Sequence, residues 1–166
     1  MPWLTPDAHM EAVEQARDIV LRRLDRSSAP RAQLEELLAR KEVDSRVAQE
    51  VLDRLEAAGL VDDTAYAAMV ARTRFTEKGA ARRAIAEELR RKGLGEKAIA
   101  AALEQIGDDD ERAAARQLAA KKMRSLQGLD EQVRKRRLAA FLGRKGYSAS
   151  IVWEVVNSAV QEAETE

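Results

Sequence analysis

Apolar side chains recur at helical spacing along almost the whole sequence. They stand three and four residues apart, as at Leu34, Leu37 and Leu38, or at Ile151, Val152 and Val155. That period matches one buried face of an α-helix. The pattern predicts nine helices, of which eight end near Arg26, Lys41, Gly59, Gly79, Gly93, Gly107, Gly128 and Gly146, while the ninth begins at Ser148.

Polar residues that favour helix starts precede many of these segments. Asp44-Ser45, Asp62-Asp63, Asp130 and Ser148 are placed to cap the helices that follow them. For the first helix we predict Thr5 as the N-cap, Pro6 at the first helical position and Asp7 in the first turn. The acidic run from Asp108 to Glu111 is expected to begin a helix, because carboxylates favour the positive end of the helix dipole.

The helical pattern repeats along the chain. LARKEVDSRVAQEVL from Leu38, LRRKGLGEKAIAAAL from Leu89 and LGRKGYSASIVWEVV from Leu142 share a Leu, a cationic pair, a short break and an apolar ladder. Their offsets of 51 and 53 residues suit three helices per repeat. We therefore predict an all-α, elongated array of three tandem three-helix repeats, spanning residues 1–60, 61–107 and 108–166.

The predicted core follows from the same periodicity. It includes Leu38, Leu52, Leu55, Leu89, Leu103, Ile106, Leu142, Ile151 and Val155. We also assign Tyr66, Phe141, Tyr147 and Trp153 to apolar helix faces. Phe75 is the aromatic residue that we place among cations.

An Arg-Lys pair occupies the same place in each repeat, at the end of its second helix. The pairs are Arg40-Lys41, Arg91-Lys92 and Arg144-Lys145. Cations at a helix C-terminus stabilise it by roughly 0.3–1 kcal/mol, so capping alone accounts for the pairs as well as an anionic partner does. Gly93 and Gly146 are suited to the turn that follows, whereas Glu42 fills that position in the first repeat, which leaves the geometry of that turn open.

The charges are unevenly distributed although the formal net charge is zero. Residues 1–64 contain 9 basic and 14 acidic side chains, a net charge of −5, whereas residues 65–150 contain 20 basic and 11 acidic side chains, a net charge of +9. An acidic partner of the basic region is one explanation, and the ordinary charge of exposed helix surfaces is the other.

The composition offers little for catalysis or metal binding. The chain has no cysteine and one histidine, His9, which we expect on a solvent-facing helix surface. It has no glycine-rich phosphate loop, and the carboxylates of residues 108–111 point in different directions from a helix start. We expect no enzymatic activity, no cofactor and no metal. Because no signal peptide or spanning segment is visible, we expect a cytoplasmic protein without membrane contact.

The stretch GLVDDTAYAAMVARTRFTEKGAARRAIAEELRRKGL, from Gly59 to Leu94, is the most specific part of the sequence. It resembles the centre of the bacterial RecX family of RecA regulators, and the likeness extends over about residues 15–160. The matching residues are Gly59, Leu60, Asp62, Asp63, Tyr66, Ala67, Arg72, Arg74, Glu88, Leu89, Lys92 and Gly93. Many relatives have Gly-Pro where Ala80-Ala81 stands here.

The resemblance implies a non-enzymatic regulator with a defined partner. Such a protein binds filaments of RecA on single-stranded DNA and inhibits ATP hydrolysis and strand exchange, and thereby recombination, DNA repair and the SOS response. We expect a monomer that contacts the RecA filament and the single-stranded DNA within it, and weak direct DNA binding stays open. A helical-repeat adaptor or a helix-turn-helix DNA-binding protein that acts without RecA is the alternative.

We predict that cations of the second and third repeats form the surface that binds the filament. Arg134 to Arg137 are the strongest case, because four cations near a helix start oppose the helix dipole and so do not serve their own helix. The predicted binding residues are Arg72, Arg74, Lys78, Arg82, Arg83, Arg91, Lys92, Lys121, Lys122, Arg124, Arg134, Lys135, Arg137, Arg144 and Lys145.

Overall fold

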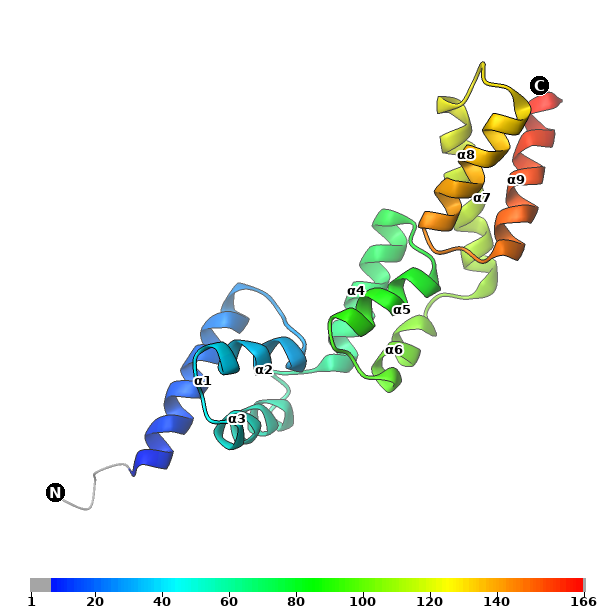
Figure 1. Cartoon of the computed structure of the whole chain (residues 1–166). Helices are drawn as coiled ribbons and strands as arrows, with labels where there is room; N and C mark the ends of the chain where they lie inside the picture. The colour runs from blue at the N-terminus through cyan, green and yellow to red at the C-terminus, as the bar shows by residue number, and fades with distance from the viewer. Residues whose placement is uncertain (1–6, 166) are drawn as a thin grey trace. The chain divides into compact units, whose positions relative to one another are not determined.

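The computed structural model describes residues 7–165, and this part of the chain is all-α (Figure 1). It forms nine helices and no strand, which confirms the predicted fold class. The helices are α1 (Ala8–Arg26), α2 (Arg31–Arg40), α3 (Ser45–Ala57), α4 (Asp63–Lys78), α5 (Arg82–Arg91), α6 (Glu96–Leu103), α7 (Asp108–Ser125), α8 (Glu131–Arg144) and α9 (Ala149–Glu164).

The chain divides into two compact units. One contains the residues up to 67 together with residues 89–99, and the other contains residues 68–88 together with those from 100 onward. The division passes through α4, α5 and α6. The repeat boundaries at residues 60 and 107 therefore stay a prediction.

In the first unit, α1, α2 and α3 pack into a three-helix bundle (Figure 1). Its core is aliphatic and includes Val20, Leu34, Leu38 and Leu52, none of which has measurable exposure to solvent. Burial of these side chains supplies most of the stability of such a bundle, at about 25 cal/mol for each Å² of apolar surface removed from water.

In the second unit, α7, α8 and α9 form another three-helix bundle (Figure 1). Its core includes Leu138, Leu142, Tyr147 and Val155, together with Ala115 of α7. The small side chains on α7, such as Ala115 and Ala119, let the neighbouring helices approach closely. Most of the predicted core is confirmed, and Leu103 is half-buried rather than buried.

The turn after the second helix of each repeat has one geometry in all three places. Glu42, Gly93 and Gly146 have φ angles of +61°, +86° and +95°. Their N–H groups donate to the carbonyls of Ala39, Arg90 and Gly143, and the N–H groups of Val43, Leu94 and Tyr147 donate to those of Leu38, Leu89 and Leu142. This pair of bonds defines a Schellman motif. The Arg-Lys pairs thus occupy equivalent positions, and the turn at Glu42 does not differ from the other two.

Contacts between α2 and α4, and between α5 and α7, repeat in the same form. The backbone N–H of Arg31 donates to a carboxylate oxygen of Asp63 at 2.8 Å, and that of Arg82 donates to Glu111 at 2.8 Å. Asp63, near the start of α4, thus caps the start of α2, and Glu111, near the start of α7, caps the start of α5. Arg31 and Arg82 are 51 residues apart, the same offset as in the repeat pattern.

In the turns after α5 and after α8, a glycine also lies very close to an alanine of another helix. A Cβ atom placed on Gly93 would lie 2.4 Å from the Cβ of Ala32, and one on Gly146 would lie 2.6 Å from the Cβ of Ala84. Real Cβ atoms do not come so close. Packing therefore requires glycine at these two turns, and the positive φ angle also favours it.

Two predictions about local structure were wrong. α1 begins at Ala8 with Asp7 as its N-cap, because the Asp7 carboxylate accepts the Met10 N–H at 2.8 Å. The expected roles of Thr5 and Pro6 lie outside the described residues. Trp153 is 73% exposed, since the buried face of α9 is formed by Ile151, Val155 and Val156.

Candidate functional site: a lysine- and phenylalanine-lined groove

A groove of about 580 Å³ in the second unit gathers several of the predicted cations. The end of α4 provides Phe75 and Lys78, and α7 provides Lys121 and Lys122. Phe141 and Lys145 close it from the end of α8. The remaining lining residues are Thr76, Glu77, Gly79, Ala114, Gln117, Leu118 and Ser125.

Two side-chain hydrogen bonds hold the end of α8 and the following turn against the end of α4. The Lys145 ammonium donates to the carbonyl of Lys78 at 2.8 Å, and the Tyr147 hydroxyl donates to the carbonyl of Gly79 at 2.8 Å. Tyr147 is buried, and its burial, together with the charge of Glu111, raises the pKa of its hydroxyl to about 12. The hydroxyl therefore stays protonated and keeps donating at neutral pH.

Gly79 completes this wall of the groove. It has a φ angle of +65°, and a Cβ atom on it would lie 2.7 Å from the Cδ1 atom of Leu118. Glycine at this position lets the chain leave α4 with a positive φ angle and without displacing the Leu118 side chain.

The groove carries a positive charge that the protein does not neutralise. Its lining contains four lysines and one acid, Glu77. In the described part of the chain, none of these lysines takes part in an ion pair. The ammonium nitrogens of Lys122 and Lys145 lie 5.2 Å and 5.9 Å from the centre of the Phe141 ring. These cation–π contacts orient both lysines toward the groove.

Sequence reasoning missed Phe141 as a site residue. Its predicted place on an apolar helix face is confirmed in part, because it is half-buried and packs against the core of the α7–α9 bundle, but it also lines the groove. The spacing of four residues from Phe141 to Lys145 places both on one face of α8, and that was the available signal. Which surface this face meets depends on contacts with α4 and α7, which periodicity does not reveal.

Other predicted binding residues already have partners within the protein. Arg74 binds Glu88 with Nε–oxygen distances of 2.9 and 3.0 Å. Lys135 lies 3.1 Å from Glu131, and Arg83 lies 3.6 Å from Glu87, each one turn away on its own helix. These pairs do not prevent a role in binding, which stays a prediction for all of them.

Arg82 has the most extensive set of partners. Its Nε atom donates to Glu111 at 2.9 Å, another nitrogen donates to the carbonyl of Ile106 at 3.2 Å, and a third bonds Asp108. The hydrogen bonds that Arg82 donates to Glu111 and then to Asp108 raise the pKa of Arg82, and the bond that Asp108 accepts lowers the pKa of its carboxyl. This arginine joins α5 to α7, so its first role is structural.

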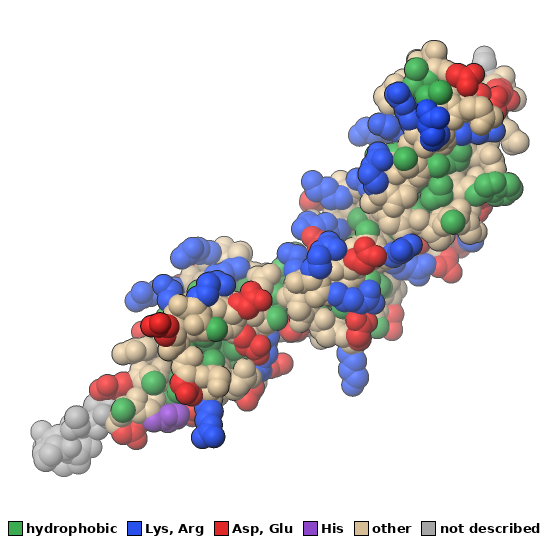
Figure 2. Space-filling view, viewed as in Figure 1, with side chains coloured by type: hydrophobic (Ala, Val, Ile, Leu, Met, Phe, Trp, Pro, Cys, Tyr) green, Lys and Arg blue, Asp and Glu red, His purple; other side chains and the backbone are tan. Residues whose placement is uncertain are grey.

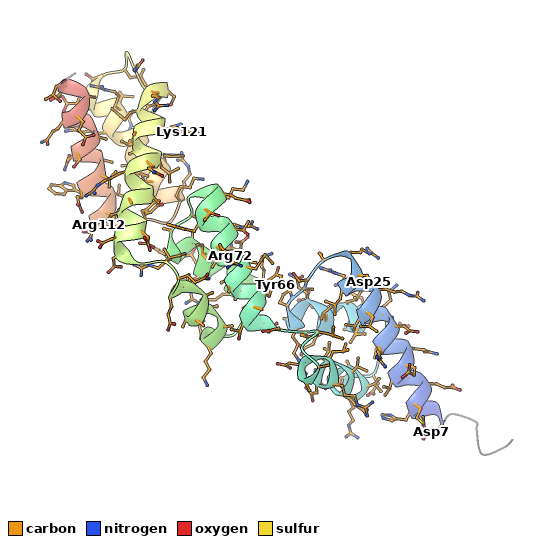
Figure 3. The ribbon with its side chains drawn as sticks, turned by 180° about the vertical axis from the view of Figure 1, so that it is seen from behind. Asp7, Asp25, Tyr66, Arg72, Arg112 and Lys121 are labelled. Atoms are coloured by element: carbon orange, nitrogen blue, oxygen red, sulfur yellow. The ribbon has the colours of Figure 1, made fainter. Side chains whose placement is uncertain are left out.

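The remaining predicted residues are not brought into the groove. Arg124 and Arg134 line a separate cleft, which is described below. Arg72, Arg91, Arg137 and Arg144 are exposed and Lys92 is half-buried, and Arg91 and Lys92 belong to the first unit. Figure 2 shows Lys and Arg side chains exposed on the α7–α9 bundle, and Figure 3 shows Arg112 and Lys121 toward opposite ends of α7.

The chemistry of the groove suits a single-stranded polyanion. Lysine ammonium groups bind phosphates as point charges, and aromatic rings provide surfaces on which unpaired bases stack. The described residues contain no group of three acidic or histidine side chains that could hold a metal ion. Among the described helices, none has the length and apolar character required to cross a membrane.

Comparison with known proteins identifies relatives along most of the chain. Residues 62–103 match the second three-helix domain of RecX, and residues 109–156 match the third. Regulatory protein RecX of Streptomyces coelicolor is 43% identical over 152 residues, which cover 92% of this chain and 81% of that protein.

Solved structures agree with this comparison. A crystal structure of regulatory protein RecX aligns with a TM-score of 0.80 and 26% identity, over 90% of this chain and 74% of that chain. A crystal structure of RecX from Lactobacillus salivarius aligns with a TM-score of 0.81 over 94% of this chain and 99% of that chain, and at 19% identity it supports the fold alone.

Proposed function

This chain belongs to the RecX family of regulatory proteins, and on that premise we propose that it binds filaments of the RecA recombinase on single-stranded DNA and slows their ATP hydrolysis. It acts by binding, without a reaction of its own. Inhibition of the filament then reduces strand exchange, recombination and the SOS response. The active form is a cytoplasmic monomer.

The observation that carries this proposal is the groove on the second unit, which is lined by phenylalanines and by lysines that form no ion pair in the described part of the chain. Lys78, Lys121 and Lys122 supply charge for phosphates, while Phe75 and Phe141 offer ring surfaces to bases. A filament presents both a protein surface and a DNA strand. The groove accounts for contact with the strand, and the family relationship supports contact with RecA.

The alternative is a DNA-binding protein or adaptor that acts independently of RecA. The same groove favours it, because single-strand binding by lysines and aromatic rings needs no second protein. The two functions differ in one measurable consequence. When single-stranded DNA is in excess over this protein, a protein that binds DNA alone leaves most of the strand to RecA, so slower ATP hydrolysis by RecA under that condition indicates the regulator.

The test measures ATP hydrolysis by RecA on single-stranded DNA with increasing amounts of this protein at low salt. We expect hydrolysis to slow with the wild-type protein. The double variant Lys121→Glu/Lys122→Glu should require at least about tenfold more protein for the same effect, because it places two repulsive charges in the groove. The matched control, Arg40→Glu/Lys41→Glu, makes the same charge change on the first unit and should inhibit like the wild type.

Two results would count against the proposal. Unchanged hydrolysis at saturating wild-type protein would exclude regulation of RecA, and binding to DNA without RecA would then favour the alternative. Equal loss of inhibition in both double variants would show that the groove is not the contact site. Circular dichroism of each variant checks that the helices are retained.

A further inference from the structure

A second hollow lies within the second unit, bordered by α7, α8 and α9. It is a cleft of about 400 Å³ whose lining differs in chemistry from that of the groove. Its lining includes Arg116, Arg124, Arg134, Ala119, Ala120 and Glu162. We call it the arginine cleft.

The walls of the arginine cleft are formed by small side chains. Ala119 and Ala120 of α7 face the cleft, as do Ser158, Ala159 and Ala163 of α9. A hollow lined by these short side chains remains beside the contact between the two helices. Met123 adds a flexible apolar side chain that adapts to irregular shapes. One apolar side chain of a partner therefore fits here.

Three arginines surround this apolar space, and Glu162 is the one acidic residue in the lining. Arg116 reaches Glu154 at 3.4 Å, and in the described part of the chain Arg124 has no ion pair. The Nε atom of Arg134 is buried without a hydrogen-bond partner. Arg134 also has no ion pair in the described part of the chain, so a ligand carboxylate beside its guanidinium would be favoured.

We propose that the arginine cleft binds an acidic segment of a partner protein that inserts one apolar side chain between α7 and α9. Arginine matches carboxylate geometry through two parallel hydrogen bonds, which lysine does not provide. The lining contains no aromatic ring on which a nucleobase would stack, in contrast to the groove. The cleft therefore has the chemistry of a peptide site, and its ligand class differs from that of the groove.

Glu162 tunes this interaction. It belongs to the lining of the cleft, so its negative charge repels an acidic ligand. Replacing it with glutamine removes that repulsion. The variant Glu162→Gln should therefore bind an acidic segment several-fold more tightly than the wild type, roughly in line with one removed like-charge contact.

The test uses a fluorescent synthetic peptide with a central leucine flanked by glutamates and aspartates, titrated with the full-length protein. A control peptide carries glutamines and asparagines instead. We expect the acidic peptide to bind and the control to bind at least about tenfold more weakly. Arg124→Gln alone, and Arg124→Gln combined with Arg134→Gln, should each weaken binding of the acidic peptide. Ala120→Trp should block binding by filling the cleft.

The matched control is Arg136→Gln/Arg137→Gln. It removes two cations from α8, the helix that carries Arg134, without changing the lining of the arginine cleft. It should bind the acidic peptide like the wild type. Equal binding of both peptides, or equal loss in the control variant, would overturn the proposal. So would a variant of Arg124 that loses affinity for a single-stranded oligonucleotide but not for the peptide. Arg124 is exposed, so its variant tests the cleft even if replacement of Arg134 disturbs folding.

Discussion

At the scale of single residues, Glu42 occupies a backbone conformation that glycine adopts at the two equivalent turns. Its φ angle of +61° is unfavourable for a residue with a Cβ atom. We predict that Glu42→Gly raises the free energy of unfolding by about 1 kcal/mol, because the strain disappears and the turn is otherwise the same. Urea denaturation of the wild type and the variant measures the change.

Gly146 provides the opposite experiment at the equivalent position. Gly146→Ala should lower the free energy of unfolding by about 2 kcal/mol, because the added Cβ atom would meet the Cβ and backbone N of Ala84 at 2.6 and 2.9 Å. If Glu42→Gly is also destabilising, the Glu42 side chain makes favourable contacts that outweigh the strain.

Tyr147 makes the stability of the fold depend on pH in the alkaline range. Its raised folded-state pKa of about 12 exceeds the value of about 10 in an unfolded chain. The contribution of the Tyr147 hydroxyl to the free energy of unfolding is therefore complete below about pH 10, and it is lost as the pH rises toward 12. Tyr147→Phe should be less stable than the wild type at pH 8, and the difference should shrink at pH 11. Urea denaturation at both pH values measures it, and a constant difference would contradict the burial effect.

At the scale of helices, the acidic run from residue 108 to 111 makes two kinds of contact. Asp108 and Glu111 bind Arg82, and Asp110 accepts the N–H of Gly107. Glu111 is 6% exposed, caps the start of α5 and binds the side chain of Arg82. We predict that Glu111→Gln lowers the free energy of unfolding by about 2 kcal/mol, because charge-assisted hydrogen bonds in a buried position are lost.

The matched control is Asp109→Asn, which removes a fully exposed charge from the same turn of α7. It should change stability by less than about 0.5 kcal/mol. Equal effects of the two variants in urea denaturation would show that these carboxylates act only through the helix dipole, as the sequence alone suggests.

The helices and their core faces were predictable because both follow from local patterns. Asp44, Asp130 and Ser148 cap the helices assigned to them. The capping of α5 by Glu111 was not predictable, because Arg82 and Glu111 are distant in sequence. Any acidic residue from 108 to 111 satisfies the local preference for carboxylates at a helix start. The place of Phe141 in the groove was not predictable for the same reason, since it depends on how α4 and α7 pack around this side chain.

At the scale of the whole molecule, the net charge of −5 over residues 1–64 and of +9 over residues 65–150 gives these two stretches different expected roles. Arg40-Lys41 lies in the acidic region and ends α2, whereas Lys121 and Lys122 line the groove. The first pair is well placed for the α2 dipole, and the second lies where phosphates would bind. Salt dependence separates these roles, because each phosphate contact releases counterions.

The last prediction follows from that difference. For binding to single-stranded DNA, the slope of log affinity against log salt should decrease in magnitude by about 0.7 for each groove lysine replaced, so Lys121→Gln/Lys122→Gln should reduce it by about 1.4. Arg40→Gln/Lys41→Gln should leave the slope unchanged and lower stability by about 1 kcal/mol at most. Fluorescence titration at four salt concentrations measures the slopes. A larger change for Arg40→Gln/Lys41→Gln would place the DNA contacts on the first unit, where the surplus of carboxylates makes them least favourable.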